Sequence, residues 1–105
     1  MVQDISPAEL NARLTAADPP TVLDVRDPWE LDIARLPGTL DIPMIEVSAR
    51  LADLPRNREV VVMCRSGGRS AKVAEYLDRE GYRVQNLAGG ILAWARDVDP
   101  TLATY

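Results

Sequence analysis

The chain has 105 residues, of which 47% are hydrophobic and 27% charged, the length and composition of one ordinary globular domain. Its net charge of -4 leaves too few cations for a broad basic face, which excludes nucleic acid as the expected partner. The chain has no histidine and a single cysteine, and this excludes Cys-His and Ser-His-Asp catalytic groups, the usual zinc ligand sets and an internal disulfide.

The sequence shows no sign of a membrane or export segment. No apolar run is long enough to cross a bilayer, and the first residues lack the basic stretch and apolar core of a secretory signal. We therefore expect a cytoplasmic protein with no membrane partner, and a single domain over residues 1–105.

Predicted strands and helices alternate along the whole chain. Apolar, β-branched runs predict strands, and capped segments with helical spacing predict the helices between them. The expected strands are 2–5, 21–25, 40–42, 60–63 and 82–86, and the expected helices are 7–16, 28–36, 44–51, 70–80 and 91–96. This alternation predicts an α/β sandwich with a mostly parallel sheet.

Two helix starts carry clear signals. Ser6, Pro7 and Glu9 have the order of a capping box with proline at the first helical position, and Asp27 begins a second capped segment. The tryptophans, Trp29 and Trp94, are expected in the core or at an interface.

The most informative stretch is the segment that we call the cysteine motif, Cys64-Arg65-Ser66-Gly67-Gly68-Arg69-Ser70. Cys64 follows a buried strand and precedes a helix, where loop amides and the helix dipole stabilise a thiolate. The glycines allow successive N–H groups to turn inward as an anion nest. Arg69 can direct two donors toward a bound oxyanion, and Arg65 can do the same at the rim. Taken alone, a lone cysteine is more often a small buried hydrophobe, but this combination favours a nucleophile.

Other polar residues follow neighbouring strands. Asp24 interrupts an apolar strand, and we prefer a structural pair with Arg26 over a supporting role in the site, because buried charges are normally paired. Ligands of parallel sheets bind beyond the carboxyl ends of the strands, so 24–26, 42–43 and 87–90 are expected at the same rim as Cys64.

With these residues in view, the chain resembles the single-domain rhodanese family of sulfurtransferases. The cysteine motif is the specific part of the likeness. Softer parts follow in the same order, at Ile5-Ser6-Pro7-Ala8-Glu9-Leu10, Leu23-Asp24-Val25-Arg26, Glu30, Leu36-Pro37-Gly38-Thr39-Leu40-Asp41-Ile42-Pro43 and Leu87-Ala88-Gly89-Gly90-Ile91-Leu92-Ala93-Trp94. The resemblance implies a three-layer sandwich whose five-stranded sheet has helices on both faces, in agreement with the five strands predicted above.

The resemblance also implies a reaction. Cys64 would take the outer sulfur of thiosulfate or a similar small anionic donor, hold it as a persulfide, and pass it to cyanide in vitro or to a thiol or protein in the cell. Arg65 and Arg69 would bind the donor, and the backbone through Ser70 would hold the persulfide. No metal or organic cofactor is implied. One departure is Arg35, which stands where the family often has histidine, and this puts that histidine's contribution to packing or donor binding in question.

Three alternatives stay open at this point. A phosphatase or arsenate reductase also uses a cysteine before an anion-binding arginine, but those loops are one residue longer than the four-residue gap between Cys64 and Arg69. A rhodanese-like sulfur-carrier or regulatory binding module is the second, although such domains frequently lose the cysteine. A redox sensor is the third, and the lack of a resolving cysteine weakens it.

Overall fold

The computed structural model describes residues 1–105 and contains five strands, four α-helices and two 3-10 helices. In chain order they are β1 (Gln3–Ile5), α1 (Pro7–Leu14), β2 (Thr21–Asp24), α2 (Pro28–Ile33), β3 (Leu40–Asp41), η1 (Met44–Glu46), η2 (Ser48–Asp53), β4 (Val60–Met63), α3 (Gly68–Arg79), β5 (Val84–Leu87) and α4 (Gly90–Asp97). None of the helices is long and apolar enough to cross a membrane.

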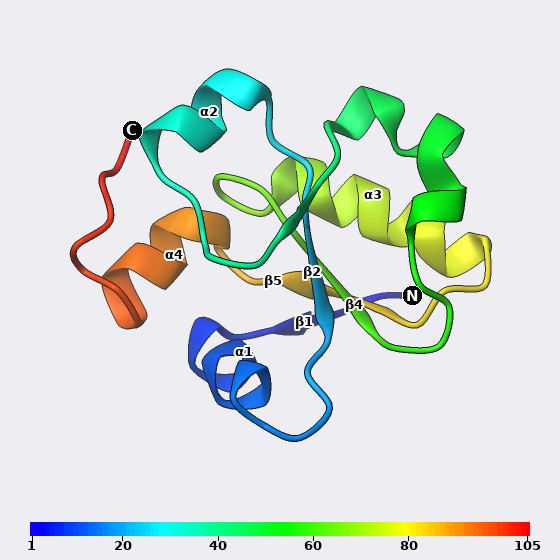
Figure 1. Ribbon diagram of the computed structural model, residues 1–105, viewed down its shortest axis with the longest axis horizontal. Helices are drawn as coiled ribbons and strands as arrows, with labels where there is room; N and C mark the ends of the chain where they lie inside the picture. Colours follow the sequence, from blue (N-terminus) through cyan, green and yellow to red (C-terminus); the bar gives the residue numbers. More distant parts are fainter.

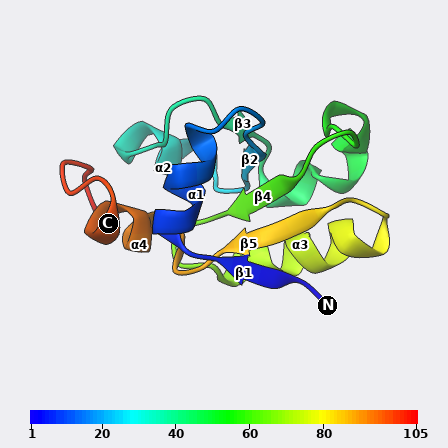
Figure 2. The same cartoon turned by 90° about the horizontal axis from the view of Figure 1, so that it is seen from below.

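The five strands form one sheet in the order β1-β5-β4-β2-β3, and every neighbouring pair is parallel. The predicted α/β class and parallel sheet are therefore confirmed. All strands end at the same edge, with β4 in the centre between β2 and β5. Figure 1 shows α1 below the strands and α3 above them, and Figure 2 shows the parallel arrows of β4 and β5 running in one direction.

Strand β4 divides the core between the two faces of the sheet. All four of its residues are buried, as expected for a central parallel strand. Val60 and Val62 belong to one apolar cluster, which includes the α3 residues Val73 and Leu77. The alternate residues of β4 belong to a second cluster with Leu10 of α1 and with α4. Cys64 continues the first set, so it lies on the α3 side of the sheet.

Helices α1 and α2 begin at the predicted capping signals. Ser6 accepts from the backbone of Glu9 at 3.1 Å, and the Glu9 side chain accepts from the Ser6 N–H at 3.2 Å, which confirms the capping box. Asp27 and Glu30 form a second capping box at α2.

Several predicted boundaries were wrong. The helix expected over 44–51 is two 3-10 helices, η1 and η2, and Arg50 has non-helical backbone angles. Helix α2 ends at Ile33 rather than near residue 36, because Ala34 is already extended. Helix α3 begins at Gly68, two residues before the predicted start, and α1 ends at Leu14 rather than near Ala16. Trp94 is buried as expected, whereas Trp29 is 59% exposed and is not a core residue.

Candidate active site

Cys64 lies directly after β4, at the carboxyl edge of the sheet. The residue is 1% exposed and is the only cysteine, so its thiol is free. The next elements in the chain are a short turn and α3, whose amino terminus is directed toward the sulfur through the amide of Ser70. Strand, turn and helix therefore fix the sulfur at the place where an α/β sheet ordinarily binds its ligand.

Three donors of the cysteine motif reach the Cys64 sulfur. The backbone N–H of Gly67 lies 3.1 Å from Sγ and that of Ser70 lies 3.4 Å away. The Ser70 hydroxyl is the third, at 3.3 Å. Burial by itself raises the pKa of the Cys64 thiol, but these hydrogen bonds, with a further one from Ser66, outweigh burial and lower that pKa below its ordinary value.

Gly67 is the residue that turns the chain toward the sulfur. Its φ of 107° lies in the left-handed region, which only glycine adopts without strain, and it is the N-cap of α3. Because α3 then begins at Gly68, Arg69 belongs to the first turn of the helix rather than to a loop. Gly67 has no side chain that could cap the helix, which explains why the sequence predicts a later helix start.

The amino terminus of α4 closes the other side of the motif. Ile91 N–H donates to the Cys64 carbonyl at 2.9 Å, and Leu92 N–H donates to the Arg65 carbonyl at 3.1 Å. A Cβ on Gly90 would lie 2.5 Å from the Cys64 carbonyl oxygen and closer still to that of Arg65, so only glycine fits there. The segment 87–90 therefore contacts the motif, as its position after β5 predicts.

Asn86, near the end of β5, is a polar residue of the site that sequence reasoning missed. It is 7% exposed, and its Oδ1 accepts from the Ser70 hydroxyl at 2.6 Å. Its Nδ2 donates to the Gly67 carbonyl at 3.3 Å and to Asp4 at 3.4 Å. The available signal was an amide in a predicted buried strand, since buried polar groups need partners.

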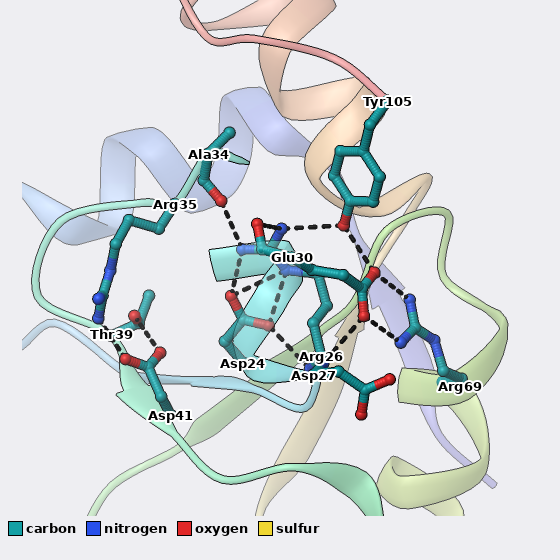
Figure 3. A network of polar contacts seen from close by, with 10 residues as sticks. All are labelled: Asp24, Arg26, Asp27, Glu30, Ala34, Arg35, Thr39, Asp41, Arg69 and Tyr105. Atoms are coloured by element: carbon teal, nitrogen blue, oxygen red, sulfur yellow. Dashed lines mark hydrogen bonds and ion pairs between the residues drawn. The ribbon is translucent and has the colours of Figure 1, made fainter. Parts of the chain in front are cut away.

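Arg69 points to α2 and not to the sulfur. Its guanidinium makes two bonds to Glu30, at 2.7 Å and 2.8 Å, as Figure 3 shows. Glu30 is 2% exposed, and the Arg69 guanidinium lowers the pKa of this carboxyl to about 2. From the sequence, Glu30 is noted only as part of the family resemblance, because its pairing with Arg69 spans 39 positions along the chain.

Asp24 and Arg26 form the structural pair that was preferred from the sequence. Both are buried, and Arg26 donates to the Asp24 carboxylate at 2.8 Å. Arg26 also donates to the Ala34 carbonyl at 2.8 Å and to the Tyr105 hydroxyl at 3.0 Å. The Tyr105 hydroxyl in turn donates to Glu30 at 2.7 Å. We call this set the charged network; its members are Asp24, Arg26, Glu30, Arg69 and Tyr105 (Figure 3).

Arg65 contacts Tyr105, at the end of the chain. It donates to the Tyr105 carbonyl, and its guanidinium lies 5.1 Å from the centre of the Tyr105 ring. Its Nε is buried without a hydrogen-bond partner. Of the predicted site residues, the structure therefore gathers Gly67 and Ser70 around Cys64 and directs both arginines of the motif to other partners.

The remaining predicted positions lie at the edge of the site. Ser66 and Gly68 are exposed, on the outer side of the motif. Arg35 is exposed and pairs with Asp41 (Figure 3). No group of three or more His, Cys, Asp or Glu side chains is placed to hold a metal ion. The chemistry that this arrangement supports is that of a thiolate stabilised by neutral donors, one that can attack an electrophilic atom without a general base.

Comparisons with known proteins agree with this geometry. The family model described as a rhodanese-like domain matches residues 6–97. A sulfurtransferase from Allochromatium vinosum is 40% identical, over 98% of this chain and 97% of its own. The putative sulfurtransferase YtwF from Bacillus subtilis is 32% identical, over 94% and 96% of the two chains. The crystal structure of a rhodanese-like domain protein from Staphylococcus aureus superposes with a TM-score of 0.86, at 32% identity and 99% coverage of both chains.

Proposed function

The chain belongs to the rhodanese-like domain family, and from that premise we propose that it is a sulfurtransferase that carries sulfur as a Cys64 persulfide. Relatives of nearly equal length that are named sulfurtransferases support a role in sulfur transfer. The observation that supports a persulfide on Cys64 is the set of hydrogen-bond donors from Gly67 and Ser70 around Sγ. The proposal treats residues 1–105 as a single domain.

In the first half-reaction, the Cys64 thiolate attacks the outer sulfur of thiosulfate. The new bond joins Sγ to that sulfur, the sulfur–sulfur bond of the donor breaks, and sulfite leaves with the electron pair. The negative charge passes from Sγ to the outer sulfur of the persulfide. The donor approaches past the exposed residues Ser66 and Gly68, and the backbone N–H groups of the motif stabilise the charge.

In the second half-reaction, a thiophilic acceptor takes the outer sulfur. The acceptor, which is cyanide in vitro and a thiol or a protein in the cell, forms a bond to that sulfur while the Cys64–sulfur bond breaks. Sγ leaves as a thiolate, and the protein returns to its starting state. The hydrogen bonds that lower the pKa of Cys64 also make its thiolate a better leaving group in this step.

The intact mass of the protein after incubation with thiosulfate tests this proposal. We expect one added sulfur atom in the wild-type protein, removal of that atom by cyanide with formation of thiocyanate, and no addition to Cys64→Ser. Because the chain has a single cysteine, the adduct has one possible thiol site. Absence of the adduct, or an adduct that survives in the serine variant, would refute the persulfide.

The phosphatase alternative can be tested on the same protein. A phosphatase loop needs a free arginine over the cysteine, whereas Arg69 is held in a bidentate pair with Glu30. We therefore expect no hydrolysis of a phenyl phosphate ester by the wild-type protein. One residue inserted between Gly68 and Arg69 produces the spacing of a phosphatase loop. If the size of the loop determines whether sulfur or phosphate is bound, sulfur loading should decrease in this variant. Unchanged loading in a folded insertion variant would count against that argument.

A further inference from the structure

The Ser70 hydroxyl lies between two acceptors that it cannot serve at once. Its oxygen is 3.3 Å from Cys64 Sγ and 2.6 Å from Asn86 Oδ1. A serine hydroxyl has one proton to donate and two lone pairs that accept. Ser70 is fully buried, which leaves these two groups to compete for its proton.

The orientation of the Asn86 amide follows from its other contacts. Its Nδ2 faces two acceptors, the Gly67 carbonyl at 3.3 Å and an Asp4 carboxylate oxygen at 3.4 Å. The amide oxygen must therefore face Ser70, because the reversed amide would direct its oxygen at two other oxygens. Asn86 is thus a fixed acceptor for the Ser70 proton.

The charge on Sγ decides which acceptor receives the proton. When Sγ is a thiol, its S–H can donate to the Ser70 oxygen while Ser70 donates to Asn86, and every group has a partner. A persulfide likewise leaves Sγ without its charge, so Ser70 again donates to Asn86. When Sγ is a thiolate, it is the stronger acceptor, and Asn86 Oδ1 loses its donor.

We propose that Asn86 is a positioning residue that acts through Ser70: its amide oxygen holds the hydroxyl proton while Sγ is uncharged and releases it to Sγ when the thiolate forms. Asn86 thereby favours the thiol, and the uncharged Sγ of the loaded protein, over the thiolate. The part that concerns the loaded protein rests on the proposed function, and the part that concerns the thiol does not.

The charged groups around the motif are constant in the variants that test this inference. They are Arg65 and Arg69 of the motif, Glu30 of α2, Asp4 of β1 and Tyr105 at the end of the chain. None of them is a hydrogen-bond partner of Sγ, whose donors are Ser66, Gly67 and Ser70. A change in the titration of Cys64 can therefore be assigned to Ser70 and Asn86.

The experiment is a double-mutant cycle read by the pH dependence of iodoacetamide alkylation of the single cysteine. We expect Asn86→Leu to lower the pKa of Cys64 by roughly half to one unit, the size of one net hydrogen bond. Ser70→Ala should raise that pKa. In the Ser70→Ala background, Asn86→Leu should produce no further change, because the proton for which Asn86 competes is gone.

Gln85→Leu is the matched control. Gln85 adjoins Asn86 on β5, but its side chain accepts from Arg13 and makes no hydrogen bond to the motif, so the pKa of Cys64 should stay unchanged. If Asn86→Leu does not fold, Asn86→Ala carries the same expectation with a smaller side chain. Equal shifts in both Ser70 backgrounds would show that Asn86 acts only by holding Gly67, and would overturn the inference, as would an increase of the pKa in Asn86→Leu.

A second measurement connects the inference to sulfur loading. With thiosulfate and sulfite both present, Asn86→Leu should reduce the loaded fraction severalfold, because it favours the thiolate over the persulfide. The two proposals can fail separately. Coupling between Ser70 and Asn86 without any sulfur adduct would refute sulfur transfer alone, and an adduct without coupling would refute the role of Asn86 alone.

Discussion

The cysteine motif and the charged network meet at Arg69, but they hold negative charge in opposite ways. The sulfur of Cys64 is surrounded by neutral donors, which are backbone N–H groups and one hydroxyl. The carboxylates of Asp24 and Glu30 instead form ion pairs with the guanidinium groups of arginine residues. The neutral donors leave the negative charge of the Cys64 thiolate available for reaction, whereas the carboxylates and guanidinium groups of the charged network neutralise one another.

A charged residue that is near the nucleophile in the sequence need not bind it in the structure. Both arginines of the motif stand beside the nucleophile in the sequence, yet one is paired with Glu30 and the other contacts Tyr105. A thiolate is a single charge that oriented N–H groups can stabilise without a cation. The arginines serve the architecture around the sulfur in this structure, and any contact that they make with a donor requires exchange of an existing partner.

Breaking the charged network at its buried end should have the largest effect on stability. In Asp24→Ala, the guanidinium of Arg26 stays buried without its carboxylate, which should lower the free energy of unfolding by about 3–5 kcal/mol. Urea unfolding measures the change. Asp97→Ala is the control, since its pair with Arg96 is exposed to solvent and should contribute little to the free energy of unfolding. Equal losses in the two variants would contradict the contrast between buried and exposed pairs.

Lowering the pH tests the other carboxylate of the network. The pKa of Glu30 falls from 4.5 to about 2 in the folded protein, so its contribution is complete above pH 4.5 and is lost as the pH falls toward 2. The ionised Glu30 carboxylate should contribute up to about 3 kcal/mol to the free energy of unfolding. Unfolding free energies measured across this range should decrease in the wild type and be flatter in Glu30→Gln. The same acid dependence in both proteins would assign it to other carboxylates.

A change on the sulfur side should have a smaller effect on stability and a local one on chemistry. Gly90→Ala places a Cβ against the Cys64 and Arg65 carbonyls at a φ of 58°, and we expect a loss of about 2 kcal/mol with slower sulfur loading. Gly68→Ala is the matched stability control, because nothing lies within 4 Å of its Cβ and its φ is ordinary. Thermal unfolding of the two variants should differ clearly, and similar melting temperatures would show that the approach of α4 is not tight.

The sequence predicted those parts of the molecule that depend on local pattern. Periodicity identified the five strands, the Ser6 capping box was read from four residues, and Cys64 was placed after a buried strand. What it missed depends on contacts between distant segments. Glu30 meets Arg69 across 39 positions, and Asn86 meets Ser70 across 16, and no local spacing encodes either pair. The early start of α3 was missed because its cap is the backbone of Gly67.

One feature of the fold links its core to its chemistry. Cys64 is a member of the apolar cluster that β4 shares with α3, beside Val62 and Val73. A sulfur atom added to this side chain must therefore be accommodated next to closely packed apolar groups. If Cys64 carries sulfur as proposed, loading and unfolding are thermodynamically linked, and the loaded protein should melt at a different temperature from the unloaded protein.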